Sequence, residues 1–153
     1  MLNKDNLIQY FSDGIKLKGS EKIGTEHEKF IYSKKDLSLI PFHGERSISA
    51  VLKKFIENGW DPIIEDEQIV GANKNQASIT LEPGGQFELS GAPLNNLHET
   101  CREINDHLSF TKSLEEEFDI GFLGIGYIPL GNFNDMPKVP KKRYQQIMTP
   151  YMK

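Results

Sequence analysis

Apolar residues recur along this chain with two periods, and the period of each stretch predicts a helix or a strand. Three stretches have the 3.6-residue spacing that gathers apolar side chains on one side of a helix: residues 4–13, 45–58 and 94–118. Asp5 is placed to cap the first helix, and Asp13-Gly14 ends it. We expect residues 1–20 to form an N-terminal arm.

The helix predicted over residues 94–118 is the longest. Its expected buried stripe consists of Leu94, Leu97, Cys101, Ile104, Leu108, Leu114 and Phe118. On this stripe Cys101 is interpreted as a small buried apolar residue, with a redox or catalytic role as the alternative. His98 and His107 lie off the stripe, so we expect them at the surface or on the flank of the helix.

Five further stretches have the alternation or the short apolar runs of strands: residues 22–32, 60–65, 68–73, 77–82 and 119–128. Tight turns at Asp66-Glu67 and at residues 73–76 join three of them, which favours antiparallel pairing. The predicted fold class is therefore α+β, an antiparallel sheet with helices packed on one side. A chain of 153 residues is long enough to form a single domain, residues 1–153.

Residues 78–93 carry the densest polar chemistry on an apolar frame. Pro83-Gly84 suits the centre of a type II turn, and a bend within one longer strand fits equally well. After it, Phe87 and Leu89 alternate with Gln86 and Glu88. We therefore expect the first pair in the core and the second pair lining a polar site.

Residues 22–32 place a Glu-x-Glu pair on a strand. Glu26 and Glu28 share one face, with carboxylates about 6–7 Å apart, and His27 lies on the other face with Ile23 and Ile31. Two like charges this close repel unless a cation lies between them, and oxygen ligands suit Mg²⁺. The alternative interpretation is a solvated face of an edge strand.

Composition narrows the function classes. The net charge is −4 with no basic block, which disfavours nucleic acid as a partner. No apolar run reaches about 18 residues, so no membrane span is expected, and the first residues lack the apolar core of a signal peptide. A cytoplasmic location is the default expectation. Cys101 is the single cysteine, which excludes an internal disulfide and a cysteine-rich zinc site.

Two features towards the C-terminus are ambiguous. Gly121, Gly124 and Gly126 leave room for close packing or for a ligand, but the lysine and the helix of a phosphate loop do not follow them. After a proline-containing loop, Arg143 opens a short helix with Ile147, Met148, Tyr151 and Met152. Arg143 suits a forked contact with a carboxylate or phosphate, and a solvated basic cap is the alternative.

The carboxylates at positions 26, 28, 82 and 88 together form a candidate Mg²⁺ site on a sheet. Such clusters serve phosphoryl transfer, in which metal ions neutralise nucleotide phosphates, and also metal-assisted hydrolysis. Spacing does not choose between these two reactions.

Several motifs together resemble the N-terminal part of glutamate–cysteine ligases of the plant and alphaproteobacterial type. The most specific are Ile23-Gly-Thr-Glu-His-Glu-Lys-Phe30 and the block from Ser78 to Leu94, which contains Leu-Glu-Pro-Gly-Gly-Gln-Phe-Glu-Leu-Ser-Gly. Shorter matches are Gly59-Trp60, Leu97-His-Glu-Thr-Cys101, His107-Leu108, Gly121-Phe-Leu-Gly-Ile-Gly126, Arg143-Tyr144, Ile147-Met148 and Tyr151-Met152. The resemblance covers the chain from about residue 20 onward.

This resemblance implies part of a glutamine-synthetase-like catalytic domain. Members use ATP and Mg²⁺ to convert the γ-carboxylate of glutamate into an acyl phosphate, which the cysteine amine attacks in the first step of glutathione synthesis. By resemblance, Glu26, Glu28 and Glu88 are magnesium ligands, and Glu82 is a weaker fourth. Gln86 and Arg143 are candidate substrate contacts.

The family's enzymes run to several hundred residues, so we expect this chain to be a fragment or a shortened relative that carries only part of an active site. Alone it is expected to lack ligase activity and, with an incomplete sheet, to self-associate or to bind the missing part. Two alternatives stay open: another carboxylate–amine ligase of the same superfamily, or a non-catalytic binding or assembly module derived from it.

Overall fold

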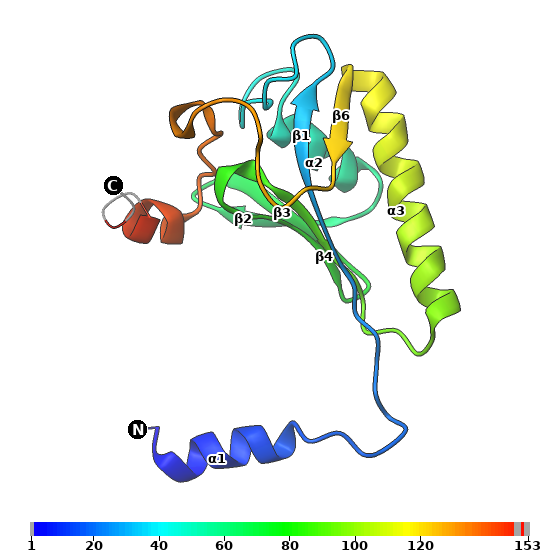
Figure 1. Ribbon diagram of the computed structural model, residues 1–153. Coiled ribbons are helices and arrows are strands. Elements are labelled where there is room, and N and C mark those ends of the chain that lie inside the picture. The colour runs from blue at the N-terminus through cyan, green and yellow to red at the C-terminus, as the bar shows by residue number, and fades with distance from the viewer. Residues whose placement is uncertain (1, 149–150, 152–153) are drawn as a thin grey trace.

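The computed structural model describes residues 2–148 and Tyr151, and its centre is an antiparallel sheet with helices on one face (Figure 1). Six strands are present in the described residues, in the order β2-β3-β4-β5-β1-β6. Their bounds are β1 Glu26–Ser33, β2 Asp61–Glu65, β3 Gln68–Lys74, β4 Ala77–Leu81, β5 Phe87–Ser90 and β6 Ile120–Leu123. All the registered neighbours pair antiparallel, which confirms the predicted fold class.

The core lies between one face of this sheet and helix α2 (Ile48–Glu57). Alternation in β4 and β5 buries Ile79, Leu81, Phe87 and Leu89 almost completely. The helix contributes its own apolar stripe, which consists of Ile48, Val51, Leu52 and Phe55. Residues 86 to 89 therefore alternate as predicted, with Phe87 and Leu89 in the core.

Helix α3 (Leu97–Phe118) begins at the Asn96 cap and packs beside β6, but its buried stripe differs from the predicted one. Leu97 and Leu108 are 68% and 44% exposed, and Cys101 is exposed. The buried positions are Thr100, His107, Thr111 and Leu114. The interpretations of Cys101 as a buried apolar residue and of His107 as a surface residue are therefore wrong.

The buried face of α3 carries polar side chains, and two of them form hydrogen bonds within the helix. The hydroxyls of Thr100 and Thr111 donate to the helix carbonyls of Asn96 and Leu108, at 3.2 and 3.1 Å. Burying these threonines therefore leaves no hydroxyl hydrogen without a partner. On the same face of α3, Nε2 of His107 meets the amine of the buried Lys29 of the sheet at 3.1 Å.

Helix α1 (Lys4–Asp13) forms where the apolar spacing predicts it and stands away from the sheet (Figure 1). Its capping box is formed by Asn3 and Asn6, not by Asp5, because the Asn3 side chain accepts from the N–H of Asn6. Residues 4–13 are all described, and none of them is buried. The arm rejoins the body at the Ile23–Leu94 bridge. No helix among the described residues has the length and apolar character needed to cross a membrane.

The β4–β5 hairpin turns at Pro83–Gly85. Gly84 has φ 78° and ψ 9°, and the N–H of Gly85 donates to the carbonyl of Glu82 at 3.1 Å. These values are those of a type II turn, the first of the two sequence alternatives. A Cβ on Gly85 would lie 2.6 Å from Pro137 and 2.7 Å from Ile48. This turn is therefore packed tightly between α2 and the loop after β6, which contains Pro137.

The strand predicted over residues 119–128 is shorter, because only β6 pairs with β1. Gly121 lies opposite Tyr32, whose ring occupies the space that a side chain at 121 would need. This glycine therefore serves packing between strands. The C-terminal segment forms a π-helical turn over Tyr144–Met148, and Met152, which was expected in the same helix, lies outside the described residues.

Candidate functional site

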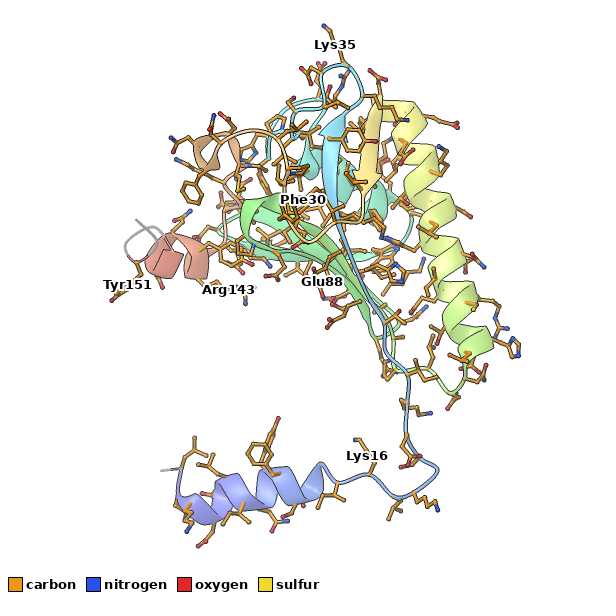
Figure 2. The ribbon with its side chains drawn as sticks, in the orientation of Figure 1. Lys16, Phe30, Lys35, Glu88, Arg143 and Tyr151 are labelled. Carbon is orange, nitrogen blue, oxygen red and sulfur yellow. The ribbon has the colours of Figure 1, made fainter. Side chains whose placement is uncertain are left out.

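The face of the sheet opposite α2 and α3 carries the glutamates. Since Lys29 pairs with Phe87 on the core side, Glu28 and Glu88 share the other side, with Glu26 opposite Ser90. In β4 the same side presents Ser78 and Thr80, which lie opposite Ser90 and Glu88. Glu88 and Arg143 both lie on the side of the sheet away from α3 (Figure 2).

Glu28 and Glu88 are direct cross-strand neighbours at the centre of this face. Glu88 is only 9% exposed, and its two oxygens accept from the hydroxyls of Ser90 at 2.8 Å and Thr80 at 3.1 Å. The amide of Gln86 donates to Glu28 at 3.2 Å. These hydrogen bonds hold the two carboxylates in place although the carboxylates repel each other. The structure therefore brings Glu26, Glu28, Gln86 and Glu88 together.

Glu82 and Arg143 form a second group at the tip of the hairpin. Arg143 lies 3.4 Å from Glu82 in an ion pair and donates to the Tyr144 hydroxyl at 2.8 Å. That hydroxyl in turn donates to the carbonyl of Leu81, at 2.9 Å. Partial burial raises the pKa of Tyr144, which keeps its hydroxyl protonated. From the sequence, Tyr144 was named only within the Arg143-Tyr144 match and was given no role, since its contact with Leu81 spans more than sixty residues of chain.

The chemistry of the four glutamates suits a divalent cation better than their arrangement does. Carboxylate oxygens on neighbouring strands are ligands that Mg²⁺ prefers. Among residues 2–148 and 151, however, no group of three or more His, Cys, Asp or Glu side chains converges on one metal position. Glu82 is engaged by Arg143, while Glu26, Glu28 and Glu88 lie on adjacent strands. The role of these four residues as ligands stays a prediction.

A polar contact behind the glutamate face was not foreseen. Lys29 and His107 are 8% and 6% exposed, and their Nζ and Nε2 atoms lie 3.1 Å apart. Burial, together with the nearby Lys29 and His27, lowers the pKa of His107 to about 3. Burial also lowers the pKa of Lys29. The alternation of residues 22–32 puts Lys29 on the same face as Ile23 and Ile31, and this was the sequence signal that Lys29 is buried.

Comparison with known proteins now assigns the chain to a family. The model described as glutamate-cysteine ligase family 2 (GCS2) matches residues 22–153. The chain belongs to this family. This match confirms the resemblance to glutamate–cysteine ligases that the sequence motifs of this chain indicated.

Three members of the glutamate-cysteine ligase family show how far the similarity extends. Glutamate–cysteine ligase, chloroplastic, of Medicago truncatula is 49% identical over 152 residues, which are 99% of this chain and 29% of the relative. Glutamate–cysteine ligase A, chloroplastic, of Oryza sativa subsp. japonica is 46% identical over 151 residues, 99% and 30% of the two chains. The Arabidopsis thaliana enzyme of the same name as the first is 45% identical over 152 residues, 99% and 28%. The chain thus spans less than a third of the length of these relatives.

The same comparison corrects the expected location. These relatives are named as chloroplastic proteins, so the expectation of a cytoplasmic location is wrong. That expectation rested on the lack of an apolar signal-peptide core. Such a core marks secretion and does not distinguish the cytoplasm from a plastid.

Proposed function

We propose that this chain serves the ATP- and Mg²⁺-dependent ligation of the glutamate γ-carboxylate to the cysteine amine, and that it supplies one wall of the active site. The observation that carries this proposal is the cross-strand pair of Glu28 and Glu88, flanked by Glu26, on the face of the sheet opposite α2 and α3. The proposal is also supported by the membership of the chain in the glutamate-cysteine ligase family.

The chemistry requires a polar, organised surface. The γ-phosphoryl group of ATP passes to a γ-carboxylate oxygen of glutamate, which gives an acyl phosphate and ADP. The cysteine amine then attacks the acyl carbon, the C–O bond to phosphate breaks, and the amine loses a proton. Phosphoryl transfer proceeds by positioning and charge stabilisation, and a bound Mg²⁺ supplies charge stabilisation for the phosphates.

The proposal gives each residue of the glutamate face a role. Glu26, Glu28 and Glu88 would hold Mg²⁺ on the sheet face, and Glu82 would serve as a weaker ligand. Gln86 already donates to Glu28, so its amide orients that carboxylate and presents its carbonyl oxygen to a substrate. Arg143 is held against the Tyr144 ring, 4.8 Å from its centroid, which fixes the guanidinium for a forked contact with a carboxylate or phosphate.

A hybrid enzyme tests this function. In the Medicago truncatula relative, the segment that aligns with this chain is replaced by the chain itself, which is 49% identical to it. We expect ADP release that depends on ATP, glutamate and cysteine together, with γ-glutamylcysteine as the product. Replacing cysteine with other amines in the same assay tests the alternative of a different carboxylate–amine ligase.

The glutamate pair is tested in the same hybrid. Glu28→Gln together with Glu88→Gln should lower kcat by about 100-fold or more, because charge stabilisation is lost. Glu45→Gln, at an exposed position before α2, is the matched control and should leave kcat unchanged. Full activity of the doubly substituted hybrid would rule out the proposed role of the pair. The 153-residue chain alone is expected to release no ADP.

A further inference from the structure

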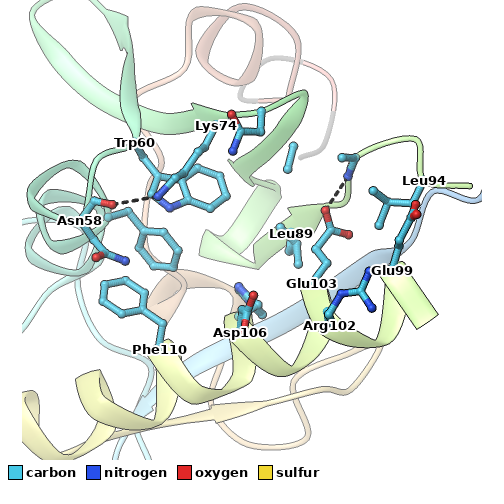
Figure 3. Close-up of a pocket in the computed structure, with 15 residues that line it drawn as sticks. Asn58, Trp60, Lys74, Leu89, Leu94, Glu99, Arg102, Glu103, Asp106 and Phe110 are labelled. Carbon is cyan, nitrogen blue, oxygen red and sulfur yellow. Dashed lines mark hydrogen bonds between the residues drawn. The ribbon is translucent and has the colours of Figure 1, made fainter. Parts of the chain in front are cut away.

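A hollow of about 430 Å³ lies on the helix-covered side of the sheet (Figure 3). The start of α3 forms one wall, with Arg102, Glu103 and Asp106, and Trp60 and Lys74 lie across from it. Leu89 contributes to its floor, and this residue alternates with Glu88 along β5. The sheet therefore separates the hollow from the glutamate face, so the proposed ligase site does not use it.

One end of the hollow is aromatic. Phe55 stands edge-on to Trp60 and to Phe110, with ring centroids 5.4 and 4.8 Å apart. Trp60 and Phe110 are only partly buried, unlike Phe55, so both keep ring surface open to the hollow. Aromatic surface of this kind accommodates an apolar side chain of a ligand.

The α3 wall presents two opposite charges without a partner. Glu99 and Glu103 accept from the backbone N–H groups of Asn95 and Ala92, both at 2.8 Å, and the second oxygen of Glu103 is buried with no hydrogen-bond partner among the described residues. Arg102 and Asp106 line the hollow one helical turn apart, and within the described residues neither forms an ion pair or a side-chain hydrogen bond. Both residues are exposed, and a cation and an anion one helical turn apart complement a zwitterion better than a ligand with a single charge.

A buried donor adds to this arrangement. His107 also lines the hollow, and its Nδ1 atom is buried with no hydrogen-bond partner among the described residues. Its Nε2 atom faces the Lys29 amine at 3.1 Å. Because an amine is the donor in such a contact, we assign the ring hydrogen to Nδ1. A buried N–H without an acceptor is costly, and a carboxylate oxygen would satisfy it.

We propose that this hollow is a binding site for a free α-amino acid with a bulky apolar side chain. The ligand carboxylate pairs with Arg102 and accepts from His107 Nδ1, its ammonium group pairs with Asp106, and its side chain packs on Trp60 and Phe110. The volume falls within the range of small-molecule sites. This site is independent of the proposed ligase site, because it lies on the other face of the sheet.

The chain contains a direct reporter for this site, because Trp60 is its single tryptophan. Titration of the 153-residue chain with L-phenylalanine, with excitation of tryptophan alone, should change the Trp60 emission saturably. We expect 3-phenylpropionate, which lacks the ammonium group, and 2-phenylethylamine, which lacks the carboxylate, to bind about tenfold or more weakly. L-Glutamate, a zwitterion without an apolar side chain, should bind weakly in the same way.

Two substitutions at exposed positions locate the ligand. Arg102→Gln and Asp106→Asn should each weaken L-phenylalanine binding by about tenfold. Arg46→Gln, which removes an exposed arginine paired with Asp119, is the control and should leave the binding unchanged. No saturable change with L-phenylalanine, or equal binding by the Arg102 and Asp106 variants and the unchanged chain, overturns the proposal. The hybrid-enzyme assay of ligase function is unaffected by either outcome, so the two proposals fail separately.

Discussion

The Nζ atom of Lys29 lies 3.1 Å from Nε2 of His107, on the reverse side of the strand that carries Glu28. Both side chains are buried, and the His107 ring stacks on Phe87 with centroids 6.4 Å apart. A protonated His107 would place two positive charges in contact in this buried position. The contact therefore holds only while the imidazole is neutral, and it ties the stability of the domain to pH.

The first prediction concerns this pH dependence. The pKa of His107 is lowered from 6.5 to about 3 in the folded state, so between these values the unfolded chain binds more protons. The free energy of unfolding should therefore fall as pH decreases from about 6.5 towards 3, by a few kcal/mol. Urea denaturation followed by Trp60 fluorescence at pH 7.5 and pH 5 measures it.

A pair of variants assigns that pH dependence to His107. His107→Asn removes the titrating ring, and the remaining dependence on pH between 7.5 and 5 should be clearly shallower. His98→Asn removes an exposed histidine of the same helix and should leave the dependence unchanged. An equally steep loss of stability in the His107 variant would show that other groups cause it.

The second prediction concerns repulsion on the glutamate face. Glu28→Gln removes one of two like charges that face each other across β1 and β5, and a glutamine still accepts from Gln86. Without divalent cations, the variant should be more stable than the unchanged chain by about 0.5 kcal/mol. If the pair binds Mg²⁺, added Mg²⁺ should stabilise the unchanged chain and not Glu28→Gln, in thermal melts at constant ionic strength. Glu45→Gln, which should respond to Mg²⁺ like the unchanged chain, is the control.

The third prediction concerns the close packing at the hairpin tip. Gly85→Ala would place a methyl group 2.6 Å from Pro137 and 2.7 Å from Ile48, at a φ of +77°. We expect a loss of about 2–4 kcal/mol in the free energy of unfolding. Gly59→Ala has nearly the same φ, +81°, but meets only the end of the Lys74 side chain at 3.8 Å, so it should cost about 1 kcal/mol. Equal losses in the two variants would mean that backbone strain alone acts at Gly85.

The fourth prediction concerns the N-terminal arm. Since no residue in 4–13 is buried, a chain that starts at residue 22 should retain the free energy of unfolding of the longer chain within about 0.5 kcal/mol. A chain that starts at residue 26 also loses the Ile23–Leu94 bridge and should be less stable. Urea denaturation followed by Trp60 fluorescence compares the two. A marked loss on removing residues 2–21 would show that the arm packs on the body in solution.

The local patterns of this sequence were sufficient for the presence of the strands and for the side that each residue of β5 faces, although β6 is shorter than the strand predicted over residues 119–128. Alternation decides these features directly, because a residue such as Phe87 has an apolar side chain and its neighbour Glu88 has a charged one. The type II turn at Pro83-Gly84 could be offered only as one of two alternatives, since both conformations suit those residues. Partners distant in the chain, such as Pro137 against Gly85, are part of the environment of this turn, and local spacing does not reveal them.

The face of α3 could not be predicted in the same way. Leu97, Leu108 and Cys101 lie on a stripe about 100° from the one that is buried, since His107 and Leu108 are adjacent in the helix. The apolar period favoured the leucines, whereas the sheet offers Lys29 as a partner for His107. For the glutamates, sequence reasoning grouped four residues, and the structure separates Glu82 at the tip from Glu28 and Glu88. Whether a residue lies at a strand centre or at a hairpin end depends on register, which spacing alone does not give.

The alternation in β1 and β5 has a consequence for how this protein can change over time. Shifting β5 by one residue against β1 would turn Glu88 into the core and bring Phe87 and Leu89 into solvent. Hydrophobic packing therefore sets the position of Glu88, and a single-residue insertion or deletion in β5 would move it off the glutamate face, away from its partner Glu28 on β1. Point substitutions can change the side chains of the glutamate face and leave its position unchanged. An insertion or deletion between Phe87 and Ser90 would instead exchange the two sides of the strand, which the core cannot tolerate.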